Sequence, residues 1–353
     1  MKKARNSNME LLRIFTMLMI VIYHIYVHCV RQQLGTGEIF ITPTYHNQLF
    51  ILSTISPMGI IGNTIFILIS GYFMAHKETI NLVSIAKKLL LQQGFSAIIL
   101  TIISILVYRN TGGFSLKLFE ITSFNDMSWY VGYYFLVILC ASLFLNKFLA
   151  KLDKTNYIKF LVITFAITQF SWIIGIFNSL AGGLISLFVG LFLYALGGYI
   201  HRFNPFENIR TIVIIGIILA SYLLIYISGY STAKNDNCAG IPNFENYYFL
   251  PICMGICIFE LFRRIPPFKN KVVNYIGAST FMVYLLHDNN FFYSIWDTQD
   301  WITLLYNQPV DYTLKHILWG MATFLIGTLS YSAYLLSEII FRKCYHLILK
   351  TRK

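Results

Sequence analysis

The feature that most constrains this chain is a succession of ten long apolar runs, separated by short polar segments, along 353 residues. A helix of roughly 18 or more apolar residues spans a bilayer. Hydrophobic residues make up 57% of the chain and charged residues 12%, about half their usual share in a soluble domain. The sequence predicts an all-α, polytopic transmembrane bundle of about ten helices: Glu10–Cys29, Met58–Ala75, Lys88–Tyr108, Trp129–Leu149, Ile158–Phe177, Gly183–Ile200, Ile209–Tyr230, Tyr247–Leu261, Val273–Tyr293 and Leu314–Phe341.

Lysines and arginines predict the orientation of these helices, because they accumulate in short cytoplasmic loops. With a cytoplasmic N-terminus, 21 of the 27 fall in inner segments, 5 in outer segments, and Arg13 within the first helix. We therefore expect both termini in the cytoplasm. The net charge of +12 is then a signal of topology and predicts no nucleic-acid partner.

The chain shows no Pro/Ser linker and no internal repeat, so residues 1–353 are expected to form a single integral membrane domain. Its six cysteines are scattered and form no zinc pattern. We therefore expect no metal.

The chemistry is expected near the first helix, because ionisable residues inside membrane helices are expensive and usually functional. Ten residues separate Arg13 from His24, which places both on one helix face, about 16 Å apart in depth. Arg13 suits a phosphate at the cytoplasmic mouth of a site, and His24 suits a general base deeper in. Glu10, three residues before Arg13, is placed to orient it by an ion pair. Spacing alone leaves a structural alternative open, in which Arg13 reaches lipid head groups and His24 makes a buried interhelical hydrogen bond.

Four segments stand out in order along the chain: Asn8–His24, Ile65–Tyr72, Ser128–Val131 and Phe281–Asp288. They resemble landmarks of the membrane acyltransferase 3 family, which has an Arg, ten residues and then a His in its first helix. The resemblance covers essentially the whole chain.

The resemblance implies acyl transfer across a bacterial-type plasma membrane. The donor would be a cytoplasmic acyl-coenzyme A, with acetyl-coenzyme A preferred to the succinyl form, and the acceptor a hydroxyl of a capsular or exported polysaccharide. His24 would match the family's essential histidine and Arg13 its partner. Many members have Asp where this chain has Glu10. Where members often carry paired arginines at the third helix, this chain has Lys87 and Lys88, which we expect to contact the donor as point charges.

Other polar residues leave alternatives open. Ser70-Gly71 favours close helix packing over a nucleophile, since no strand-turn-helix elbow surrounds the serine. His287 and Asp288 are expected at the depth of His24, where they line the acceptor site or make an ordinary polar contact.

Trp296 and Trp301, with Asp297 and Asp300, have the composition of a sugar-binding platform. The alternative is that they anchor the chain at the membrane interface.

A different class of protein, a transporter or polymerase of lipid-linked oligosaccharides, would also be basic, aromatic-rich and many-helical. It predicts charged residues along a path through several helices. In this chain the charges expected within the membrane concentrate beside His24.

Overall fold

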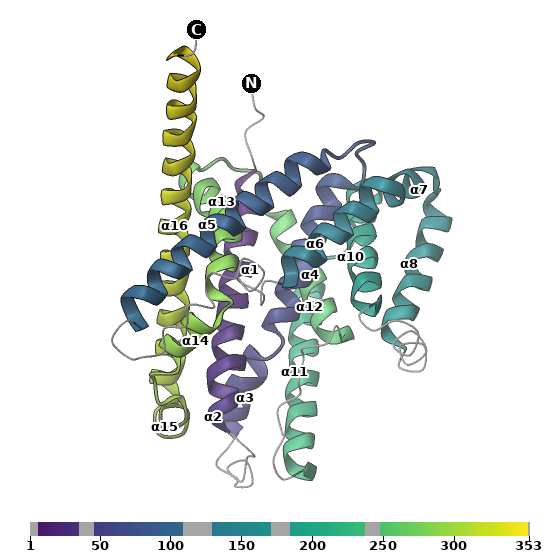
Figure 1. The fold of residues 1–353 in the computed structure, drawn as a ribbon. Coiled ribbons are helices and arrows are strands. Elements are labelled where there is room, and N and C mark those ends of the chain that lie inside the picture. The colour runs from purple at the N-terminus through teal and green to yellow at the C-terminus, as the bar shows by residue number, and fades with distance from the viewer. Residues whose placement is uncertain (1–5, 35–45, 109–128, 171–183, 237–247, 352–353) are drawn as a thin grey trace.

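The structure, a computed structural model, describes residues 6–34, 46–108, 129–170, 184–236 and 248–351, and these ranges contain helices and no strand. Each of the ten predicted apolar runs contains a helix (Figure 1). The elements are α1 (Ser7–Ile25), the π-helix η1 (Tyr26–Val30), α2 (Arg31–Leu34), α3 (His46–Ile55), α4 (Met58–Met74), α5 (Leu82–Tyr108), α6 (Trp129–Cys140), the π-helix η5 (Ala141–Leu145), α7 (Asn146–Lys151), α8 (Lys154–Gln169), α10 (Leu184–Phe203), α11 (Thr211–Asp236), α12 (Phe249–Arg264), α13 (Lys271–His287), α14 (Asn290–Trp296), α15 (Trp301–Asn307) and α16 (Pro309–Thr351).

Seven helical stretches in the described ranges are long and apolar enough to cross a membrane: Ser7–Val30, Gln48–Met74, Leu82–Ile102, Trp129–Lys151, Leu184–Phe203, Thr211–Ser231 and Pro309–Cys344. The three remaining predicted spans correspond to α8, α12 and α13, which have 16, 16 and 17 residues. Large aliphatic side chains are exposed along the outer faces of α5, α11 and α16, among them Ile98, Leu219 and Leu325. Lipid is the environment that suits such faces.

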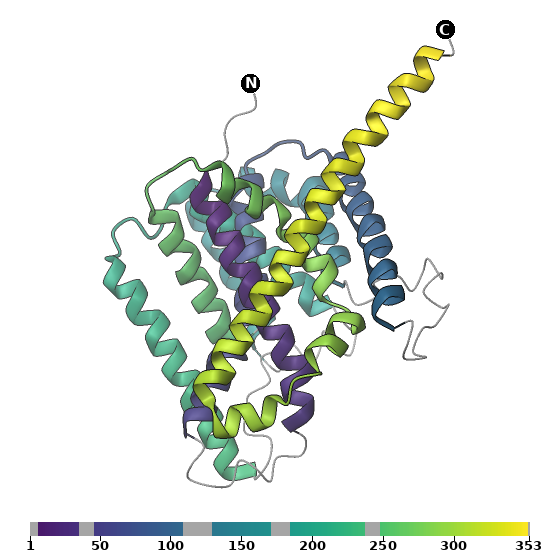
Figure 2. The ribbon, with the colours of Figure 1, turned by 90° about the vertical axis from the view of Figure 1, so that its left-hand side faces the viewer.

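The segments predicted to be cytoplasmic lie at one end of the bundle. The start of α1 and the end of α16 share this end in both views (Figures 1 and 2). Hydrogen bonds join the inner segments in pairs: Ser7 N–H to Phe268 O (3.0 Å), Asn146 Nδ2 to Lys77 O (2.8 Å), Arg202 Nη1 to Leu149 O (3.2 Å) and Arg263 Nη2 to Asn204 Oδ1 (2.6 Å). The gathering of the inner segments at one end agrees with the prediction, and the cytoplasmic assignment of this end stays a prediction.

One predicted helix is divided in the structure. The ninth helix, expected to run without a break over Val273–Tyr293, ends at His287, and α14 begins at Asn290. The helix is interrupted there because the Asn289 side chain accepts hydrogen bonds from the N–H groups of Phe291 and Phe292 and so caps a new helix. The outer segment between the first two predicted helices contains two short helices, α2 and α3.

Helices α4 and α10 pack closely on each other. A Cβ added to Gly71 would collide with the backbone carbonyl of Tyr194, and one added to Gly197 would collide with the Leu68 carbonyl. Only glycine lets two helix backbones approach this closely. The prediction that Ser70-Gly71 serves packing is confirmed for Gly71, while Ser70 donates a hydrogen bond to Phe66 O (3.0 Å).

Candidate active site

The polar residues of α1 begin with an ion pair at its inner end. Arg13 Nη1 lies 2.9 Å from Glu10 Oε1, as the three-residue spacing predicted. Glu10 is buried, and Gly277 of α13 packs against it: a Cβ on this glycine would lie 2.5 Å from Glu10 Oε2. The Arg13 side chain is 30% exposed. The buried carboxylate therefore holds the guanidinium in place and leaves part of it accessible.

A cavity of about 310 Å³ opens beside Arg13, between α1, α4, α5, α6 and α13. Arg13 and Lys88 supply its positive charge, and Tyr130, Tyr134 and Tyr284 supply phenol hydroxyl groups. The volume lies at the lower end of the range for small-molecule sites, ~300–1,000 Å³. Asn63, Phe66, Ser70 and Met74 line it from α4, and this spacing places them on one helix face. The cavity thus has cationic groups contributed by α1 and α5, and tyrosines contributed by α6 and α13.

His24 continues the line of α1 residues along this cavity. The cavity touches α1 at Arg13, Met17 and Ile20. Steps of four and three residues return to one helix face, and four residues after Ile20 comes His24. The imidazole therefore lies beyond the outer end of the cavity on the cavity-facing side of α1, about 16 Å from Arg13 along the helix axis.

Two side chains from the end of α13 meet His24. Its Nδ1 lies 2.8 Å from Nε2 of His287 and 3.5 Å from Oδ1 of Asp288. His287 is fully buried, and its Nδ1 lies 2.9 Å from the carbonyl oxygen of Val283. Asp288 accepts a hydrogen bond from the Tyr293 hydroxyl (2.6 Å). The expectation that His287 and Asp288 reach the depth of His24 is confirmed by these contacts.

The break between α13 and α14 positions Asp288. This residue caps α13 with φ −89° and ψ 69°, outside the helical region. Irregular backbone at membrane depth is tolerated where protein buries it or where it lines a cavity. Asp288 is 4% exposed and Asn289 5%, so protein buries this break. Because the helix ends there, the carboxylate of Asp288 and the imidazole of His287 can both face His24.

Tyr284 connects the cavity with the histidine pair. Its hydroxyl oxygen accepts a hydrogen bond from the backbone N–H of Tyr130 (3.1 Å), which leaves its own O–H available as a donor. Its ring meets the His287 ring edge-on, with centroids 5.8 Å apart. Tyr284 and Tyr130 were not predicted as site residues, although both lie inside segments that carried the family resemblance. Tyr134 and Tyr293 had no such signal.

The two lysines predicted as donor contacts separate in the structure. Lys88 lines the cavity with Arg13, whereas its neighbour Lys87 is exposed and does not line it. Successive residues of a helix point about 100° apart, so one lysine of the pair faces the cavity and the other turns away.

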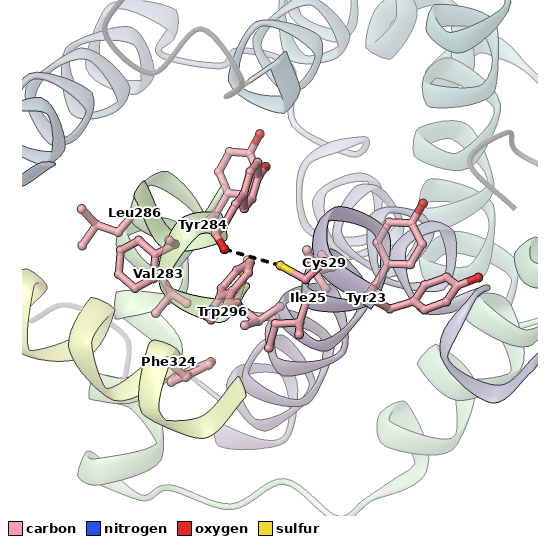
Figure 3. Close-up of a cluster of buried hydrophobic side chains, with 14 of the residues drawn as sticks. Tyr23, Ile25, Cys29, Val283, Tyr284, Leu286, Trp296 and Phe324 are labelled. Atoms are coloured by element: carbon pink, nitrogen blue, oxygen red, sulfur yellow. Dashed lines mark hydrogen bonds between the residues drawn. The ribbon is translucent and has the colours of Figure 1, made fainter. Parts of the chain in front are cut away.

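The structure does not support a sugar platform at Trp296 and Asp297. Trp296 is fully buried in the cluster that side chains of α1, η1, α13 and α16 form (Figure 3), and its Nε1 donates to Thr323 (3.2 Å). Trp301 is equally buried and donates to Trp296 O (2.9 Å). Exposed Asp297 accepts from Gln33 (2.7 Å). A buried ring presents no face to a sugar, because the hydrophobic core already covers it.

Comparison with known proteins identifies the family. The family model described as an acyltransferase domain, of the acyltransferase 3 type, matches residues 6–333. No curated protein and no solved structure matches the chain. The match spans Arg13, His24, the cavity and the pair His287–Asp288. The several apolar helices and this match make the chain a multi-pass membrane protein, and it belongs to the membrane acyltransferase 3 family.

Proposed function

We propose that this acyltransferase moves an acyl group, acetyl in preference to succinyl, from cytoplasmic acyl-coenzyme A to a hydroxyl of a cell-surface or exported polysaccharide. One observation carries the proposal: a cavity with Arg13 and Lys88 on its wall follows α1 toward His24. Arginine and lysine bind phosphate, the arginine by a fixed fork of donors. The thiol arm of coenzyme A leads away from its phosphates, so a donor bound in this cavity would have its thioester near the imidazole of His24.

The hydrogen bonds around His24 assign its tautomer. Val283 O can only accept, so Nδ1 of His287 carries the proton, and Nε2 of a neutral His287 is an acceptor. Nδ1 of His24 is then the donor in the 2.8 Å contact. Its Nε2 is left unprotonated, and in the described ranges no protein group hydrogen-bonds that atom. A general base needs this form, with a third group holding its orientation.

In the proposed step, Nε2 of His24 takes the proton of the acceptor hydroxyl while the hydroxyl oxygen bonds to the thioester carbonyl carbon. The carbon–sulfur bond of the tetrahedral intermediate then breaks, and the departing thiolate takes the proton back from His24. Asp288, 3.5 Å from His24 Nδ1, stabilises the imidazolium that exists between these two events. The products are an ester on the glycan and free coenzyme A, and this scheme uses no metal ion.

Tyr284 is our candidate for the group that stabilises the oxyanion. It lines the cavity, its ring meets that of His287, and Tyr130 N–H fixes its hydroxyl oxygen. A hydroxyl donor held in place before the reaction lowers the barrier more than one that must reorient. His287 has both ring nitrogens engaged, so we assign it a positioning role and no longer a contact with the acceptor.

The decisive test replaces His24 by Gln. The variant keeps size and hydrogen-bonding capacity but loses the basic nitrogen, so acyl transfer should fall by about 10²- to 10⁴-fold. The assay is ester formation by detergent-purified protein reconstituted in lipid, with the melting temperature as the measure of folding. His28→Gln, one turn further along, is the matched control and should transfer normally. If the His24→Gln protein is folded and fully active, the base is another residue.

The acyl group and the acceptor call for a separate measurement. Cell-surface glycan from a strain that lacks this chain should lose one class of ester, which mass spectrometry would identify as acetyl or succinyl. A glycan with unchanged esters would contradict the proposed acceptor. A lipid-linked oligosaccharide transporter would instead change the amount of exported glycan and not its esters.

A further inference from the structure

Three potential metal ligands gather at the outer end of α1. One ligand atom each from His24, His28 and Asp288 lies within 4.8 Å of the other two. The two histidines come from α1 and η1, and the aspartate from the break after α13. The proposed mechanism uses His24 and Asp288 but has no role for His28. Two imidazoles and one carboxylate form a ligand set that zinc-like ions prefer, with a fourth position left for water.

The distances fit a metal ion after a small contraction. Ligand atoms about 2.0–2.1 Å from a tetrahedral zinc ion lie roughly 3.3 Å from one another. Nδ1 of His24 and Oδ1 of Asp288 are already 3.5 Å apart. A metal ion on this nitrogen replaces its hydrogen bond to His287, and the ring proton moves to Nε2 of His24. The His28 ring, whose centroid lies 5.6 Å from that of His24, therefore has the larger movement to make.

Tyr293 contacts and orients two of the three potential ligands, His28 and Asp288. Its ring stacks on the His28 ring, with centroids 3.9 Å apart and an angle of 9° between the planes. Its hydroxyl donates to the carboxylate of Asp288 (2.6 Å). Neighbours that orient ligands in this way raise the metal affinity of a site. The π-helix η1 contains His28, and single-turn π segments occur frequently at functional sites.

We propose that a divalent transition-metal ion of the zinc type binds His24, His28 and Asp288 and thereby inhibits acyl transfer. The inhibition rests on the proposed function, because it follows from the role of His24 as the base. A metal ion on Nδ1 of His24 uses the lone pair of that atom, so the ring proton lies on Nε2, the nitrogen that acts as the base in the proposed mechanism. A metal-bound His24 therefore cannot take the proton of the acceptor hydroxyl. The metal is an inhibitor and not a cofactor, so the reaction itself still needs none.

The first arm of the test measures binding alone. Purified protein in detergent, stripped by a chelator, is titrated with Co²⁺, whose visible absorption reports tetrahedral coordination. The wild type should bind one equivalent, which Zn²⁺ then displaces. His28→Gln should lose this spectrum, whereas His76→Gln, an exposed histidine at the inner end of α4, should keep it. Absence of a tetrahedral spectrum, or an unchanged spectrum in His28→Gln, would overturn the site.

The second arm measures transfer with and without Zn²⁺. His28→Gln should transfer at the wild-type rate in the presence of chelator and need at least about tenfold more Zn²⁺ for half-inhibition, the effect of losing one ligand or its support. If chelation abolishes transfer and Zn²⁺ restores it, the metal is required and the inhibitory role is wrong. If no acyl transfer is found at all, the proposed function fails, while the Co²⁺ titration still decides whether the metal site exists.

Discussion

Two helix pairs, α4–α10 and α1–α13, both pack through glycine residues but differ in the contacts that follow along the helices. Both have a glycine contact: Gly71 and Gly197 join α4 to α10, and Gly277 meets Glu10 between α13 and α1. In α4–α10 the contact continues to Ala75 and Gly198, so the helices stay together for two turns. In α1–α13 the next residues line a cavity, and the helices meet again through His24 and His287. A series of small residues keeps α4 and α10 packed together, whereas a single small residue followed by polar groups leaves room for a candidate site between α1 and α13.

The largest effect should come from breaking the α4–α10 joint. A leucine at Gly71 would collide with the backbone of Tyr194, and backbone cannot move aside as a side chain can. Overpacking usually costs about 1–3 kcal/mol, and a clash with backbone belongs at or above the upper end. We expect Gly71→Leu to yield little folded protein, measured by thermal unfolding in detergent. Gly216→Leu is the control, since nothing lies within 4 Å of a Cβ there. Equal melting temperatures for the two variants would refute the comparison.

The next effect should appear where α1 and α13 meet again. His287→Leu removes the acceptor for His24 Nδ1–H and should lower kcat by about 10- to 100-fold, the usual cost of losing a group that orients an imidazole. The KM for acyl-coenzyme A should stay near that of the wild type, because the residues proposed to bind the donor phosphates, Arg13 and Lys88, do not contact His287. His287→Gln offers an oxygen acceptor and should recover part of kcat. A merely structural role would predict a lower melting temperature and no recovery by Gln.

Relations within one helix could be predicted from the sequence, whereas contacts between helices could not. The spacing of Arg13 and His24 on one helix face follows from local geometry, and so does the ion pair with Glu10. The break after His287 was not predicted, because apolar residues continue on both sides of it and neither Gly nor Pro marks it. The pairing of His24 with His287 joins residues 263 positions apart, and no local pattern encodes such a contact. The burial of Trp296 was not predicted, because a buried and an exposed tryptophan look alike in sequence.

A smaller effect is expected at the inner end of the cavity. Arg13→Ala removes the guanidinium that Glu10 holds at 2.9 Å and should raise the KM for acyl-coenzyme A about tenfold, since a charged hydrogen bond contributes about 1.5 kcal/mol or more. Arg13→Lys should recover only part of this loss, because a lysine lacks the fork of donors. Isothermal titration with coenzyme A would measure the same affinity without catalysis. An unchanged affinity in the folded Arg13→Ala protein would exclude the phosphate role.

The smallest expected effect is a difference between substitutions of the neighbours Lys87 and Lys88. Both are exposed basic residues of α5, so their removal changes the net charge equally, yet only Lys88 lines the cavity with Arg13. An exposed ion pair contributes at most about 1 kcal/mol, so Lys88→Ala should raise the KM for acyl-coenzyme A by no more than about fivefold. Lys87→Ala should leave it unchanged. Because screening weakens exposed charges, the effect of Lys88→Ala should shrink as salt increases. Equal shifts in the two variants would mean that the donor senses the overall charge of this face and not the cavity.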